Sequence, residues 1–158
     1  MDVHMSLDRK YNRLLQRHRH DVVKYWDALM GEILRRQVPA HLICIFNAPT
    51  EALSQAVAAR LRASRCESLQ VVFVTRARWL WGKSSWWSVA AEDVNPPPLT
   101  IDGVSGWVER MVTLGADVGA QFDSWGPIEA ESWGQWRISD PAQALQQPRA
   151  FNLPPPTV

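Results

Sequence analysis

The run HLICIF, residues 41–46, constrains the fold of this chain more than any other stretch. In an extended strand, Cys44 points to one side while Ile43 and Ile45 point to the other, and both sides are apolar along the run. A strand with this pattern lies inside a sheet that is covered on both faces. The chain must therefore build a sheet and provide cover for its two faces.

Apolar spacing and turn residues predict the elements around this strand. Apolar residues recur every three or four positions over residues 6–36, which predicts one long amphipathic helix that Pro39 ends. The run Asn95-Pro-Pro-Pro interrupts the later pattern. The elements that we expect after the first strand are a helix capped by Thr50, strands over 69–77 and 84–94 around a hairpin tip at Gly82-Lys83, a helix that starts at Thr100 or Asp102 and is loosened or stopped by Gly115 and Gly119, and a short strand near Ile128 and Ala130.

After the first helix the predicted order is strand, helix, strand, strand, helix, strand. Two βαβ units of this kind form an α+β, ferredoxin-like βαββαβ sandwich with an antiparallel four-stranded sheet, here preceded by a long N-terminal amphipathic helix. Both internal helices then cover one sheet face, so the N-terminal helix or a second subunit must cover the other. We divide the chain into an N-terminal helix (1–38), a ferredoxin-like domain (39–138) and a Pro-rich tail (139–158), which is disordered or lies extended across the surface.

Several features bear on the compartment. The longest uninterrupted apolar run, residues 42–46, is far below the roughly 20 residues of a membrane helix. The N-terminus lacks the apolar core of a signal peptide. Cys44 and Cys66 lack metal or redox spacing, and the apolar surroundings of Cys44 favour a buried thiol over a disulfide. We expect a cytoplasmic, bacterial-type protein without a membrane partner.

Charge is unevenly distributed along the chain. Residues 1–83 hold 14 Lys and Arg against 7 Asp and Glu, a difference of +7, whereas residues 84–158 hold 3 against 9, a difference of −6. Two interpretations stay open at this point. Either the chain presents a face of one sign to a partner or to another copy of itself, or the two halves interleave in space as ordinary solvated surface.

Residues with catalytic or metal-binding chemistry form no recognisable motif. We find no phosphate loop, dinucleotide pattern or nucleophile elbow, and none of the four histidines has an acidic or Cys partner at ligand spacing. The carboxylate pairs Glu92-Asp93 and Glu129/Glu131 fit solvated strand positions better than a catalytic dyad. We therefore expect no enzyme, no cofactor and no metal.

Nine tryptophans are an unusual number for this length, and four of them flank one hairpin, WLWGKSSWW. In a structural interpretation, Trp81 and Trp86 form a cross-strand pair and Trp87 is core. In a functional one, the hairpin displays aromatic anchors beside Lys83 that stack on bases or fill a protein pocket. For Trp79 and Trp81, close to the tip, we expect contact with a partner.

The stretch GAQFDSWG, residues 119–126, follows an amphipathic helix and precedes a predicted strand. This pattern resembles the family of B-type regulators of ribonuclease E activity, more loosely over residues 40–131. Members commonly show Tyr-Asp-Gly-Trp, where this chain has Phe122 and Ser124 instead of Tyr and Gly. Independently of the resemblance, we expect a Gly-rich loop in which Asp123 hydrogen-bonds the backbone while Phe122 and Trp125 tuck under the sheet edge.

The resemblance implies a non-catalytic protein that binds a protein partner, since family members bind ribonuclease E and alter RNA processing through acidic surface. The basic N-terminal segment departs from that pattern. Two alternatives stay open: a nucleic-acid-binding module that uses the basic helix and the Trp hairpin, and an immunity protein against a secreted toxin. A homodimer through the N-terminal helix is a further expectation. The predicted partner-binding residues are Trp79, Trp81, Lys83, Asp117, Asp123, Trp125, Glu129 and Glu131.

Overall fold

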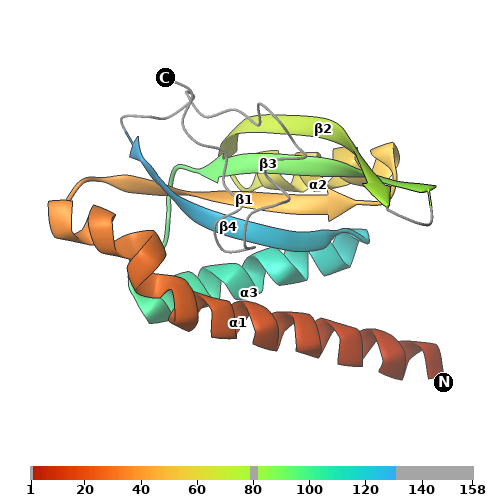
Figure 1. Cartoon of the computed structure of the whole chain (residues 1–158), viewed down its shortest axis with the longest axis horizontal. Coiled ribbons are helices and arrows are strands. Elements are labelled where there is room, and N and C mark those ends of the chain that lie inside the picture. Colours follow the sequence, from red (N-terminus) through yellow and green to blue (C-terminus); the bar gives the residue numbers. More distant parts are fainter. Residues whose placement is uncertain (1, 79–81, 131–158) are drawn as a thin grey trace.

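A computed structural model describes residues 2–78 and 82–130, with side chains for residues 8–75, 82 and 84–130. The predicted tail at 139–158 lies outside these residues. Three helices and four strands follow one another along the chain (Figure 1). They are α1 (Asp2–Arg36), β1 (Ala40–Ala48), α2 (Glu51–Ala63), β2 (Cys66–Arg78), β3 (Gly82–Asp93), α3 (Ile101–Val118) and β4 (Gln121–Glu129).

The four strands form one antiparallel sheet in the order β2-β3-β1-β4. β1, which contains the HLICIF run, lies between β3 and β4, so the strand that is apolar on both sides is an interior strand as predicted. The α+β class, the antiparallel four-stranded sheet and the preceding N-terminal helix are confirmed.

Local signals place the helix ends. The Thr50 hydroxyl accepts a hydrogen bond from the Leu53 amide (3.2 Å) at the start of α2, as an N-cap does. Thr100 caps α3 in the same way, so the helix starts there and not at Asp102. Gly119 ends α3 with φ of 82°, a left-handed conformation that favours glycine.

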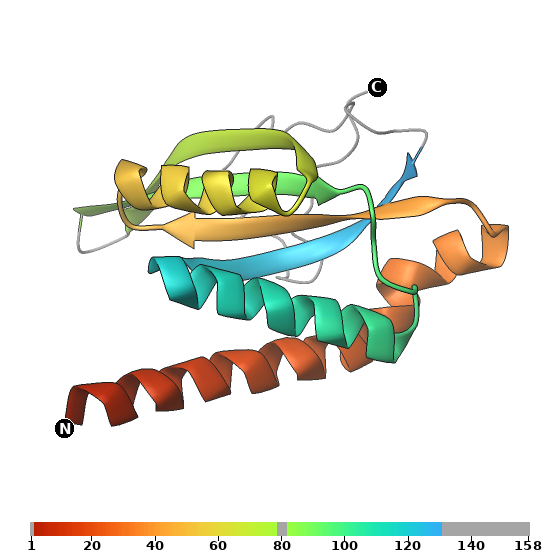
Figure 2. The same ribbon diagram turned by 180° about the vertical axis from the view of Figure 1, so that it is seen from behind.

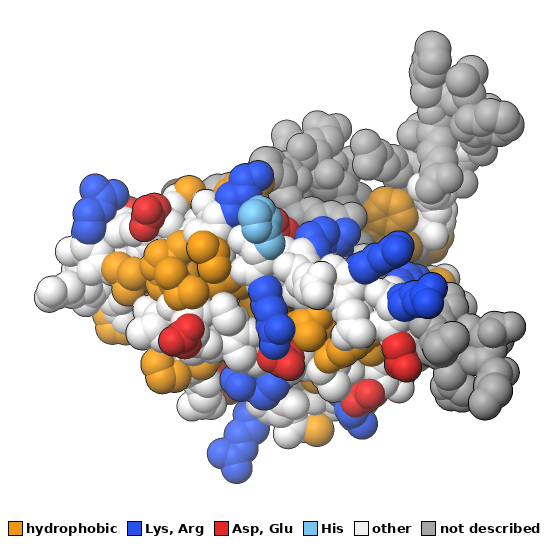
Figure 3. Space-filling model, turned by 90° about the horizontal axis from the view of Figure 1, so that it is seen from below, with side chains coloured by type: hydrophobic (Ala, Val, Ile, Leu, Met, Phe, Trp, Pro, Cys, Tyr) orange, Lys and Arg blue, Asp and Glu red, His pale blue; other side chains and the backbone are white. Residues whose placement is uncertain are grey.

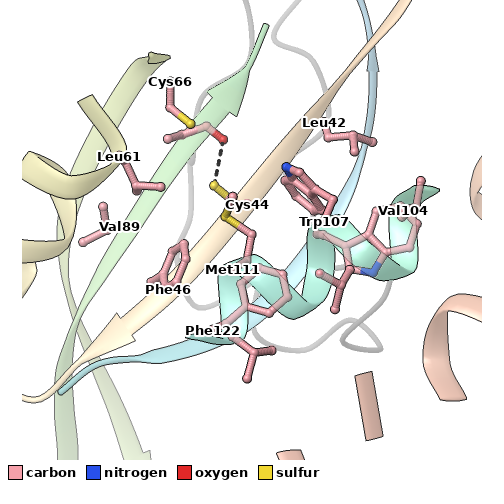
Figure 4. Close-up of a cluster of buried hydrophobic side chains, with 14 of the residues drawn as sticks. Leu42, Cys44, Phe46, Leu61, Cys66, Val89, Val104, Trp107, Met111 and Phe122 are labelled. Carbon is pink, nitrogen blue, oxygen red and sulfur yellow. Dashed lines mark hydrogen bonds between the residues drawn. The ribbon is translucent and has the colours of Figure 1, made fainter. Parts of the chain in front are cut away.

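The main core lies between the sheet and the helices α2 and α3, which cover the same sheet face (Figure 2). Phe46 from β1, Trp107 from α3 and Phe122 from β4 meet there (Figure 4). Gly115 stays within α3, and a Cβ atom at this position would meet the Ala120 carbonyl oxygen at 3.0 Å. This glycine therefore lets α3 approach the start of β4 closely.

The N-terminal helix does not cover the second sheet face, and that expectation was wrong. α1 lies beside α3 and along the edge of β4, and its buried residues join the main core (Figure 2). His18 of α1, 2% exposed, lies with Nε2 3.1 Å from the Phe122 carbonyl, so Nε2 donates this bond. β4 is an edge strand whose outer carbonyls lack a neighbouring strand, and α1 covers that edge.

The stretch at 121–126 is part of β4 and not a loop before a short strand, as the sequence pattern had indicated. Phe122 pairs with Phe46 and Ser124 pairs with Ile45, so Asp123 is an additional residue on β4, as in a β-bulge. The bulge shifts the alternation by one, which turns both Phe122 and Trp125 toward the helices. The long connection that we expected is therefore a bulged strand.

A smaller apolar cluster occupies the second sheet face. It consists of Ile43, Ile45, Ala90 and Ile128, all of them buried. None of the three helices lies on this face (Figures 1 and 2).

Candidate partner-binding surface

The structure describes only part of the predicted contact set. Trp79, Trp81 and Glu131 lie outside the described residues, and so does the side chain of Lys83, whose backbone belongs to β3. The expected contact role of the hairpin tip thus remains a prediction.

Two of the predicted contact residues are buried inside the domain. Trp125 is 1% exposed and lies in an edge-on arrangement with Trp107, at 6.5 Å between ring centroids. Asp123, at the bulge, is 6% exposed. Neither side chain can meet a partner while the domain is folded, because the bulge directs Trp125 into the helix-covered core. The motif is structural, in line with the expectation that Phe122 and Trp125 tuck under the sheet edge.

The remaining two predicted acids within the described residues, exposed Asp117 and half-buried Glu129, are ion-paired. Asp117, at the end of α3, lies 3.5 Å from Arg60 of α2, and Glu129, at the end of β4, pairs with Arg36 of α1. They stand near opposite ends of β4, a strand of nine residues that spans about 26 Å. The structure therefore does not bring Asp117 and Glu129 together into one acidic surface.

Among the described residues, three ion pairs between Arg and a carboxylate join the basic first half of the chain to the acidic second half. Besides the two pairs above, Arg19 of α1 donates to Glu109 of α3 at 2.7 Å. All of these side chains are at least a third exposed, so each pair contributes little to stability. Their effect on recognition is larger, because they neutralise acids that a basic partner would need.

A different charged surface remains on α1. Lys10, Arg13, Arg17 and Lys24 are exposed and recur at spacings of three, four and seven residues, which places them along one side of the helix. We call these four residues the basic stripe. Within the part of the chain that the structure describes, Lys10 and Arg13 make no ion pair. Figure 3 looks at the molecule from below in the orientation of Figure 1, and shows Lys and Arg side chains spread over this side.

Apolar side chains accompany the basic stripe on α1. Val23 is 60% exposed and lies next to Lys24 in the chain, and Leu34 is 40% exposed three turns further along. Lys24 also lies over the ring of Tyr25, with 5.0 Å between Nζ and the ring centroid. Cations, an aromatic ring and exposed aliphatic groups on one helix are typical of a surface that contacts another macromolecule.

Sequence analysis missed Phe73 as a candidate contact residue. Phe73 of β2 packs against Trp87 of β3 with 5.0 Å between ring centroids, yet 53% of Phe73 is exposed. The apolar pattern of strand β2 indicates that Phe73 packs on a sheet face. It does not indicate that the helices on this face leave Phe73 exposed. Trp86 pairs across the strands with Val74. Trp81, its partner in the structural interpretation, lies outside the described residues.

One groove and one buried pair of titratable side chains lie elsewhere in the described part of the chain. A groove of about 580 Å³ between α2 and α3 is lined by the ion-paired Arg60, Asp117 and Glu109. On the second sheet face, the fully buried Glu92 lies 2.7 Å from Nδ1 of His41. We had expected Glu92 to be a solvated carboxylate, but it is buried because β3 is an interior strand.

The two thiols are free and buried in the main core, which agrees with the prediction of a buried Cys44 (Figure 4). A hydrogen bond with the Cys66 side chain, together with burial, raises the pKa of the Cys44 thiol well above its usual value. The protonated thiol is a poor nucleophile, so Cys44 has a packing role.

Comparison of the chain with protein-family models, with curated proteins and with solved structures finds no match in any of the three. Among residues 2–78 and 82–130, no group of three or more His, Cys, Asp and Glu side chains is placed to hold a metal ion. Within the same residues, every helix is too short or too polar to cross a membrane.

Proposed function

We propose that this chain is a non-catalytic binding protein that docks on an acidic protein partner through the exposed side of α1. The observation that carries the proposal is the basic stripe, whose Lys10 and Arg13 are exposed and form no ion pair among the described residues. Arg19 and Arg60, which are also exposed on the helices, already have acidic partners.

The exposed apolar groups favour a protein over a simple polyanion as the partner. Val23 and Leu34 are 60% and 40% exposed, and Val23 lies within the span of the stripe along the helix. An interface that combines Arg, Tyr and aliphatic side chains excludes water at its centre and uses charges at its rim for orientation. The resemblance to ribonuclease E regulators suggests that the partner belongs to RNA processing, but the contact surface proposed here is basic and not acidic.

The architecture supports two finer assignments. We propose the ferredoxin-like topology for residues 39–138, because the order β2-β3-β1-β4, antiparallel neighbours and two helices on one face follow that fold. We also propose a reducing compartment such as the cytoplasm, because both cysteines are unpaired thiols.

A charge-reversal experiment tests the binding surface. The double variant Lys10→Glu/Arg13→Glu reverses two charges of the stripe, and Arg62→Glu/Arg65→Glu makes the same change on exposed residues at the end of α2. Tagged protein is used to recover partners from a host lysate, and affinity for the recovered partner is then measured. We expect the stripe variant to bind at least about tenfold more weakly through slower association, while the control variant binds like the parent. Equal loss in both variants, or no loss in either, would contradict the proposal.

Nucleic acid is the second candidate partner, and the regular spacing of the stripe favours it. From Lys10 to Lys24 the stripe runs roughly 21 Å along the helix. That length corresponds to roughly six phosphates of one duplex strand. In a mobility-shift titration against salt, a nucleic-acid-binding protein would show a steep dependence, and the stripe variant would lower the slope by about two. A parent protein that gives no shift at low salt would remove this candidate.

A further inference from the structure

The second sheet face is covered although no described helix lies on it. Ile43 and Ile45 on the interior strand β1 are 1% and 5% exposed, and Ala90 and Ile128 on the neighbouring strands are equally inaccessible. Side chains on an uncovered face of an antiparallel sheet are accessible to water.

Polar atoms on the same face also need partners. Asn47 Oδ1, Trp86 Nε1 and Ser124 Oγ are buried and make no hydrogen bond to any residue that the structure describes. Strand alternation places Asn47 with Ile45, and the pairing of Ser124 with Ile45 places it there too. Buried polar groups in folded proteins nearly always have a partner. The cover of this face must therefore supply donors and acceptors as well as apolar groups.

We propose that the C-terminal segment, residues 131–158, is the cover, bound as an intramolecular strap across the second sheet face. The segment leaves the sheet at the border of this face, because β4 ends at Glu129 just after the buried Ile128, and the Ala130 amide donates to the Pro39 carbonyl at 2.9 Å. No other undescribed part of this chain is long enough to cover the face, because apart from this segment only residue 1 and the hairpin tip at 79–81 lie outside the description.

Length and composition of the segment fit this role. Fully extended, it reaches roughly 90 Å. The four-stranded sheet is only about 15 Å wide, measured between its outer strands. Its five prolines disfavour helix and favour extended chain, which can follow a sheet face. Its apolar side chains are Trp133, Trp136, Ile138, Leu145, Phe151 and Leu153 together with alanines and a valine, and its glutamines can satisfy polar atoms of the face.

The strap makes a prediction that needs no substitution in the face itself. The full chain is labelled at isoleucine δ1 methyl groups and studied by NMR at a concentration where sedimentation shows a monomer. We expect nuclear Overhauser effects from the methyl groups of Ile43 or Ile45 to indole protons of Trp133 or Trp136, assigned through Trp133→Phe and Trp136→Phe. Their absence would overturn the proposal. Effects that appear only between differently labelled chains would overturn it as well, because the occupant would then be a second copy.

Thiol labelling of the full chain gives a quantitative second test. Ser88→Cys places a thiol on the second face, where Ser88 is buried, and Ser85→Cys places one three residues away at an exposed position of the same strand. Labelling at each cysteine is followed by peptide mass spectrometry. We expect Ser88→Cys to react at least 100-fold more slowly than Ser85→Cys, and Trp133→Asp/Trp136→Asp to speed it at least tenfold. Equal rates in the parent background, or no acceleration in a variant that circular dichroism shows to be folded, would overturn the strap.

Discussion

Replacing Phe122 by alanine tests whether the FDSW stretch is core or contact surface. Phe122 is fully buried, with ring centroids 4.9 Å from His18, 5.3 Å from Phe46 and 6.3 Å from Trp107. Truncation removes contacts with α1, β1 and α3 at once and leaves a cavity where they meet. A Phe→Ala change at such a site costs about 3–5 kcal/mol in the free energy of unfolding.

Phe73→Ala is the matched control, because the same truncation falls on a side chain that is 53% exposed and has Trp87 as its aromatic neighbour. We expect a loss of less than about 1.5 kcal/mol there, since roughly half of the side chain is already in water. Urea unfolding followed by circular dichroism gives both values. In a thermal scan the Phe122→Ala midpoint should fall by roughly 10 °C or more for a chain of this size. If Phe122→Ala cost no more than Phe73→Ala, the assignment of residues 121–126 to a buried, bulged strand would be refuted.

Two further stability predictions follow from the core. Gly115→Ala should lower the free energy of unfolding by about 1–2 kcal/mol despite the better helix propensity of alanine, because the new Cβ meets the backbone oxygen of Ala120. Gly31→Ala, with open space around the Cβ, should leave the free energy of unfolding unchanged or raise it by up to about 1 kcal/mol. Chemical denaturation of both variants checks the difference, and equal effects would argue against the close approach of α3 to β4. The raised pKa of Cys44 means that the folded state keeps a proton that the unfolded state releases, so stability should fall as pH rises above the ordinary thiol pKa of about 8.5, with a slope that approaches about 1.4 kcal/mol per pH unit until the folded pKa is reached. Denaturation between pH 7.5 and about 10 measures it, and Cys44→Ala should flatten the curve; an identical slope in that variant would assign the effect to other groups.

Local patterns determined the helices and the interior strand of this protein. The spacing of apolar residues placed the long helix and the interior strand at 41–46. The caps Thr50 and Thr100 begin helices and Gly119 ends one, as the residue types predict. These features depend on neighbours within about four positions, because hydrogen bonds within helices and side-chain alternation in strands are short-range. These helices, helix caps and strand alternation can therefore be predicted from the sequence alone.

The candidate site depended on contacts between residues far apart in the chain. In the sequence, Asp117 and Glu129 look like free acids, but the fold brings Arg60 and Arg36 beside them. The sequence does not reveal which basic residues are used in such pairs and which stay available on the basic stripe. The sequence left Trp125 with two roles, as a contact residue and as a side chain tucked under the sheet edge, and a single bulge residue, Asp123, turns it into the core. Charge neutralisation and strand register are decided by residues that lie some 50 to 100 positions away, and spacing along one chain carries no information about which of them will meet.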